Sequence, residues 1–310
     1  MSPAAQMNPA ARSRVESKWF PAFAWSVLVY NIAVILWGAL VRATSSGAGC
    51  GGHWPLCNGD ALPALAQAAT RIEFIHRMMS GGALIAVVAL PLWAAQVYAK
   101  GHPARRWAVW SLVFIVTEAL LGAALVLLGY VAKDQSLGRT ISLSLHLINT
   151  FTLLACLSLT AWWASRDSLP GTRSMPWNFR IAIGAVLLVS VAGAITALGD
   201  TLFPSRTLAD GMRDDFSAQA NFLIRLRVIH PVLAVLSALY LAALAFPRLK
   251  EDRLLAGSLL ALLGAQLTAG AANVLLQAPL AMQLLHLLIS DALWVALILL
   301  ANRPRVSAVN

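Results

Sequence analysis

Four histidines lie inside long apolar segments of this 310-residue chain, where a polar side chain needs a partner. They are His76, His146, His230 and His286, whereas His53 and His102 fall between the apolar segments. One such histidine alone is as often a packed residue as a ligand, but four of them favour metal ligation. Zinc is disfavoured, because no cysteine or carboxylate cluster accompanies all four. Two histidines on facing helices of a bundle favour axial ligation of haem, so the set predicts two haem sites.

The elements that position these histidines are predicted to be membrane-spanning helices. The chain is 59% hydrophobic and only 12% charged, against roughly 25% charged in a soluble domain. Windows of about 20 apolar residues, the length that crosses a bilayer, predict eight spans. They lie at 19–41, 73–98, 107–130, 140–164, 180–199, 222–246, 254–276 and 282–301. We therefore predict an all-α membrane protein embedded in a lipid bilayer.

The orientation of the spans follows from the basic residues. More than half of the 23 Lys and Arg residues fall in segments that lie inside if the N-terminus is inside. The net charge of +10 is thus explained by topology and not by a nucleic-acid surface, so no nucleic-acid partner is expected. All even spans then run inward, and their histidines form one layer roughly 6–12 Å deep. We predict a multi-pass protein of the bacterial inner membrane with both termini cytoplasmic.

An internal repeat divides the chain into two halves. The segment 121–128 resembles 269–276, with 148 residues between Gly122 and Gly270. Because each half would have four helices, the sequence predicts two four-helix bundles in a parallel repeat about an axis along the membrane normal. The predicted units are a cytoplasmic tail at 1–18, an N-terminal bundle at 19–164, a linker at 165–179, a C-terminal bundle at 180–301 and a tail at 302–310.

A group of motifs surrounds the first outer loop and the histidines that follow it. They are the run Gly38-Ala-Leu-Val-Arg-Ala-Thr-Ser-Ser-Gly47, Cys50, the run Trp54-Pro-Leu-Cys-Asn-Gly59, Glu73-Phe-Ile-His76-Arg77 and His146-Leu-Ile-Asn149. Together with His230 and His286 they resemble the bacterial haem A synthase family, over 19–301. The resemblance implies an enzyme that oxidises a methyl group of haem O to the formyl group of haem A for terminal oxidases. A haem O synthase partner is expected from the order of the pathway alone. The sequence does not identify the electron donor and leaves open whether the chain forms a homo-oligomer.

The resemblance assigns roles to five residues. His76 and His146 would bind the substrate haem O, and His230 and His286 would ligate a resident haem b. Glu73 would be the catalytic carboxylate, although a solvated carboxylate favoured by the helix dipole is the alternative for a residue at a helix start. His53 departs from the family pattern, and so does the absence of cysteine from the second outer loop, 200–221.

The chain has three cysteines, and two of them flank a short loop segment. Cys50 and Cys57 are expected to pair in the oxidising outer compartment, where closing this loop contributes about 2–3 kcal/mol. A structural disulfide and a redox-active one are both compatible with the sequence. Cys156 lies in an apolar run and is expected to be a packing residue.

Two alternative functions are compatible with parts of this pattern. A dihaem cytochrome b that only transfers electrons would need the four histidines, but neither Glu73 nor the cysteine pair. A transporter built from a parallel repeat would explain the duplication but not the histidines. Four further polar residues in the spans are expected to serve helix packing, and roles in proton or substrate handling stay open for them. They are Glu118, Asn149, Gln266 and Asp291. Arg227 stands at the repeat position of Glu73 and is expected either to pair with a haem propionate or to extend toward the membrane surface.

Overall fold

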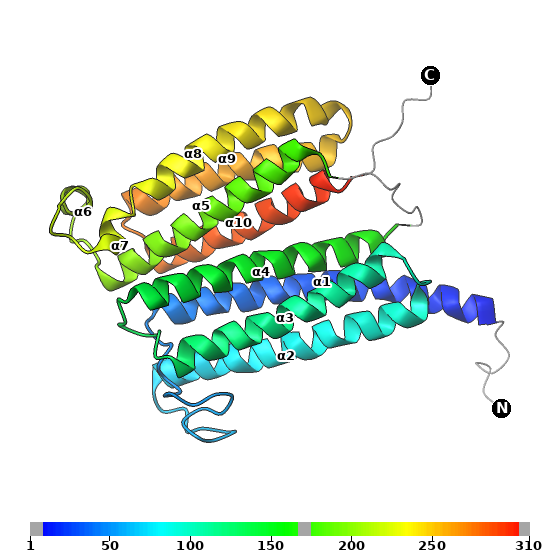
Figure 1. Cartoon of the computed structure of the whole chain (residues 1–310), viewed down its shortest axis with the longest axis horizontal. Helices are drawn as coiled ribbons and strands as arrows, with labels where there is room; N and C mark the ends of the chain where they lie inside the picture. The colour runs from blue at the N-terminus through cyan, green and yellow to red at the C-terminus, as the bar shows by residue number, and fades with distance from the viewer. Residues whose placement is uncertain (1–8, 167–174, 304–310) are drawn as a thin grey trace.

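The computed structural model describes residues 9–166 and 175–303 and is built of helices (Figure 1). The helices are α1 Pro9–Ala43, α2 Ala68–Val97, α3 Pro103–Leu127, α4 Leu137–Ala164, α5 Trp177–Leu202, α6 Leu208–Asp215, α7 Phe222–Arg225, α8 Ile229–Ala245, α9 Arg253–Leu275 and α10 Leu280–Ala301. A 3-10 turn, Phe246–Lys250, follows α8. Among the described residues, eight segments are long and apolar enough to cross a membrane, so the predicted all-α fold with eight spans is confirmed. The predicted tails and linker lie partly outside the described residues.

The spanning helices pack into two rings of four. In the first ring α1 contacts α2, α2 contacts α3, α3 contacts α4, and α4 contacts α1. In the second ring α5, α8, α9 and α10 follow one another in the same way (Figure 1). The helices that carry the histidines therefore stand at opposite corners of their ring, α2 across from α4 and α8 across from α10. The parallel repeat itself stays a prediction.

Helices α4 and α10 form the centre of the molecule, where the two rings meet. The indole N–H of Trp294 donates to the carbonyl oxygen of Phe151 at 2.8 Å, and the two rings pack with centroids 5.1 Å apart. Both side chains are almost fully buried, and such aromatic pairs contribute about 0.5–1.5 kcal/mol beyond their buried area. The first ring is thus held against the second by contacts near the middle of α4 and α10.

A partly buried arginine joins the two rings near the end that carries the long loops. Arg42, in the last turn of α1, donates to the carbonyl oxygen of Ala197 at 2.6 Å and to the hydroxyl of Thr201 at 2.7 Å. Its other terminal nitrogen donates to Oε1 of Gln283 at 2.9 Å. Because these acceptors belong to α5 and α10, the guanidinium connects three helices of the two rings.

The sixth predicted span, 222–246, is not one continuous helix. It consists of α7, a turn over residues 226–228, and α8. Pro231 explains the break, because a proline lacks an N–H and its ring clashes with the carbonyl of the residue four positions earlier, here Arg227. The loop between α5 and α7 also contains α6, a short helix that hydropathy does not predict.

The long connections gather at one end of the molecule. The loop between α1 and α2, together with α6 and α7, lies at that end in Figure 1, and the start of α1 and the end of α10 lie at the other. Short polar caps define the turns between helices. Ser136 accepts from the N–H of Arg139 at the start of α4, and Asp252 accepts from that of Leu255 at the start of α9.

Candidate functional site

Each of the four membrane histidines lies against a glycine of the preceding spanning helix. A Cβ added to any of these glycines would lie within 3.5 Å of the imidazole. The distances are 3.1 Å for Gly38 and His76, 3.5 Å for Gly122 and His146, 2.9 Å for Gly193 and His230, and 3.2 Å for Gly270 and His286. Glycine therefore lets each imidazole approach the neighbouring backbone closely, as small residues do at helix interfaces in membranes. The four contacts give the four histidines matching surroundings.

The histidines of the second ring face each other across it. The ring centroids of His230 and His286 are 6.4 Å apart, and their planes are nearly perpendicular, at 88°. Two metal–imidazole bonds of about 2 Å each, plus the distance from each nitrogen to its ring centre, require roughly 6 Å. Nδ1 of His230 lies 3.1 Å from the carbonyl oxygen of Val189, an arrangement that leaves Nε2 for a ligand. This pair fits an iron held between two imidazoles.

The first ring supports its histidine with a carboxylate. Nδ1 of His146 lies 2.9 Å from Oε1 of Glu118, so that Nε2 is left for a ligand. On the opposite helix, Nδ1 of His76 is buried and has no partner among the described residues. A buried polar atom without a partner is costly, and it fits a side chain whose partner is a bound group. The first pair thus also fits the two-histidine ligation of haem iron.

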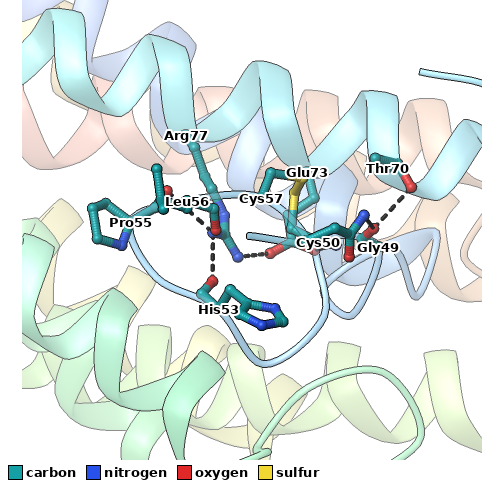
Figure 2. Close-up of a disulfide and its surroundings, with 10 residues drawn as sticks. Gly49, Cys50, His53, Pro55, Leu56, Cys57, Thr70, Glu73 and Arg77 are labelled. Atoms are coloured by element: carbon teal, nitrogen blue, oxygen red, sulfur yellow. Dashed lines mark hydrogen bonds and ion pairs between the residues drawn. A yellow bond between two sulfur atoms is a disulfide. The ribbon is translucent and has the colours of Figure 1, made fainter. Parts of the chain in front are cut away.

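Glu73 is buried beneath the first outer loop and is not a solvated residue at a helix start (Figure 2). Its side chain is in α2, and the residue is only 3% exposed. Oε2 accepts from the backbone N–H of Cys50 at 2.8 Å, and Oε1 pairs with Arg77 at 2.5 Å. Arg77 in turn donates to the carbonyl oxygens of His53 and Leu56, at 2.7 and 2.6 Å. The alternative of a solvated carboxylate is therefore wrong, since Glu73 and Arg77 anchor the loop one turn before His76.

The expected disulfide between Cys50 and Cys57 is present and buried. It closes the loop that Glu73 and Arg77 hold. His53 lies in this loop with an exposed side chain, and its backbone carbonyl rather than its ring makes the contact with Arg77. The disulfide thus closes the loop, and the side chains of Glu73 and Arg77 hold the closed loop against α2.

Thiol labelling provides a direct check of this pairing. In denatured but unreduced protein, an alkylating reagent is expected to label one thiol per chain, Cys156, because Cys50 and Cys57 are bonded to each other. Reduction before labelling should raise the count to three. Mass spectrometry of the labelled peptides gives the count, and three labels without reductant would contradict the disulfide.

The second outer connection is held by a different set of charges. Arg227, in the turn between α7 and α8, pairs with Asp200 at the end of α5 and with Asp215 at the end of α6, both at 2.9 Å. Its Nη2 is buried and has no partner among the described residues. Arg227 therefore does not extend toward the membrane surface, the second of the two alternatives, because its guanidinium is held in ion pairs with Asp200 and Asp215.

Three polar residues that the sequence analysis assigned to helix packing contact the histidine sites. Glu118 contacts His146, Asn149 donates to Glu118 at 2.6 Å, and Gln266 lies 3.2 Å from Nε2 of His286. The repeat offset could have revealed this role. Glu118 and Gln266 differ by 148 positions, the same offset as Gly122 and Gly270, so they occupy equivalent places in the two halves. Asp291, the fourth of these residues, is buried with no partner for its carboxylate among the described residues.

The fold and the paired histidines define an eight-span membrane protein with a candidate ligand pair in each four-helix ring. The chain belongs to the COX15-CtaA family of cytochrome oxidase assembly proteins, whose family model matches residues 21–298. The two long loops and all four membrane histidines lie within the matched region.

Individual relatives match different lengths of the chain. A Thermus thermophilus protein named protoheme IX farnesyltransferase is 46% identical over 288 residues, which are 90% of this chain and 47% of that protein. The chain thus spans about half the length of that relative. Heme A synthase of Bacillus licheniformis is 44% identical over 110 residues, 36% of each chain. Heme A synthase of Bacillus mycoides is 40% identical over 126 residues, 41% of this chain and 40% of that protein.

Proposed function

We propose that the chain is a haem A synthase, an oxidoreductase that converts a methyl group of haem O to the formyl group of haem A. The observation that supports this best is the pair of histidines at opposite corners of each ring, in a chain similar to the Bacillus heme A synthases. His76 and His146 would hold the substrate haem O in the first ring. His230 and His286 would hold haem b in the second.

In this proposal some residues of the chain bind and orient haem, and Glu73 handles the proton. Haem iron, when bound, supplies the redox chemistry that oxidation of a methyl group requires. The glycines set the depth of each imidazole, and Glu118 and the carbonyl of Val189 fix which nitrogen of His146 and His230 is free for a ligand. Glu73 would position water or accept a proton beside His76 as the methyl carbon is oxidised.

Location and partners follow from the same proposal. We place the protein in the bacterial inner membrane with both termini cytoplasmic, so that the Cys50–Cys57 loop faces an oxidising compartment. The Thermus relative, named for protoheme farnesylation, is about twice as long as its match to this chain. That supports a haem O synthase as the partner that supplies substrate. Conversion of the methyl group to the formyl group removes four electrons and adds one oxygen atom. The reaction therefore needs molecular oxygen as the oxidant and an electron donor that supplies the two electrons consumed at each oxygenation.

The test is conversion of haem O to haem A by the expressed protein. The chain is produced together with a source of haem O, total haem is extracted, and haem A is measured by chromatography. Conversion is expected with the natural sequence and not with His146→Ala. Protein that binds two haems but forms no haem A would instead indicate the alternative, a dihaem cytochrome b that only transfers electrons.

A further inference from the structure

The two histidine sites have corresponding polar residues that differ in charge. Glu118 lies one helical turn before Gly122 on α3, and Gln266 lies one turn before Gly270 on α9. In both rings the same helix therefore presents the glycine and the polar side chain to one histidine, His146 or His286. The first ring has a carboxylate at this position, and the second has a neutral amide.

The carboxylate of Glu118 is held by several hydrogen bonds in the first ring. Oε1 contacts Nδ1 of His146 at 2.9 Å and accepts from the hydroxyl of Thr150. Oε2 accepts from the amide of Asn149 at 2.6 Å, and that amide also donates to the carbonyl oxygen of Phe114 at 2.9 Å. Both carboxylate oxygens have partners, so the position and orientation of the acceptor beside His146 are fixed.

The corresponding contact in the second ring is less complete. The amide nitrogen of Gln266 lies 3.2 Å from Nε2 of His286. Oε1 of Gln266 is buried and has no partner within the described part of the chain, so the amide itself is not held in place. Nδ1 of His286 has no partner there either, and it is the nitrogen that the contact with Gln266 leaves for a ligand. The second histidine therefore receives no charged support, and its polar neighbour is not held as the one in the first ring is.

We propose that Glu118 is a positioning residue for His146, and that the exchange of carboxylate for amide between positions 118 and 266 gives the two haems different midpoint potentials. The inference rests on the proposed function, in which both pairs bind haem. A carboxylate that accepts the Nδ1 proton fixes the tautomer and orientation of a ligating histidine and makes the imidazole a stronger donor to the metal. Stronger donation favours ferric over ferrous iron, so the first site has the lower potential.

The experiment measures haem content and midpoint potentials in purified protein reconstituted with protohaem. His146→Ala and His286→Ala identify the signals of the first and second sites. Glu118→Gln keeps a hydrogen-bond acceptor and removes the charge, so the first haem should stay bound with a raised potential while the second is unchanged. Glu118→Leu removes the acceptor and should weaken haem binding at the first site by about 10–100-fold.

Two further variants complete the comparison. Gln266→Glu places a carboxylate in the second ring and should lower the potential of that haem only. Thr160→Val serves as the control, because it removes a buried hydroxyl of α4 whose hydrogen bond stays within the helix, to the carbonyl of Cys156. That variant should leave both potentials unchanged.

The outcomes separate this inference from the proposed function. Unchanged first-site potential in Glu118→Gln would overturn the inference, as would unchanged haem affinity in Glu118→Leu. If Glu118→Leu does not accumulate in the membrane, the midpoint potentials of Glu118→Gln and Gln266→Glu still test the inference, because these two exchanges keep the size of the side chain. A haem signal that does not change in His146→Ala would instead reject His146 as a ligand, and with it the proposed function.

Discussion

Replacement of Glu73 by Gln is expected to reduce haem A formation by roughly 100-fold or more, the scale of general acid–base groups, while haem binding and membrane yield are retained. The carboxylate lies one turn from His76, and Gln keeps its size and one acceptor for the N–H of Cys50. Only the charge and the capacity to accept a proton are removed. Chromatography of extracted haem measures the conversion, and absorption spectra measure the bound haem.

Arg77→Lys provides the matched comparison, because Arg77 holds the same loop without being the proposed proton acceptor. Lysine keeps the positive charge beside Glu73 but lacks the fork of donors that reaches two loop carbonyls. We expect a smaller loss of conversion than in Glu73→Gln. Equal losses in the two variants would assign Glu73 to anchoring the loop, and near-normal conversion by Glu73→Gln would reject the catalytic role.

Replacement of His230 or His286 by Ala is expected to abolish the low-spin spectrum of a bis-histidine haem in protein purified without substrate. Each change removes one of two imidazoles whose centroids are 6.4 Å apart, and one remaining histidine cannot supply both axial ligands. Absorption spectra of oxidised and reduced protein, normalised to protein concentration, measure the effect.

His53→Ala is the control for these two variants. His53 is a histidine of the exposed outer loop, outside the two rings, so its loss should leave the spectrum intact. An unchanged spectrum in His230→Ala or His286→Ala would remove these residues from the haem b site. Loss of the spectrum in His53→Ala would indicate that an outer-loop histidine binds iron.

The eight spans could be predicted because hydropathy and length determine them directly. The sixth span shows the limit of that argument. A window average over 222–246 does not register a single proline, yet Pro231 breaks the helix by removing a donor and crowding the preceding turn. The helix α6 was missed for a related reason, since a short polar helix in a loop has no apolar signal.

The candidate site was predicted in part. The four histidines could be selected because they lie in apolar spans, and the cysteine pair because it flanks a short loop segment. The partners of these residues could not be predicted, because a contact such as that between Glu118 and His146 joins two helices whose relative rotation the sequence does not specify. Burial of Glu73 was missed likewise, since it depends on how the loop from Cys50 to Cys57 folds back over α2.

Under the predicted parallel repeat, the contact between the two rings would have the form of an interface between two copies of one subunit. When spans are matched by order in each half, α4 corresponds to α10 and α1 to α5. In the structure α4 contacts α10, and α1 contacts α5. The remaining two contacts, α1 with α10 and α4 with α5, become equivalent to each other when the halves are exchanged. Such self-complementary pairing is isologous, the geometry of a twofold dimer. The helices α1, α4, α5 and α10 thus form the contact between the halves, and under this repeat their pairing follows the rule of a symmetric dimer.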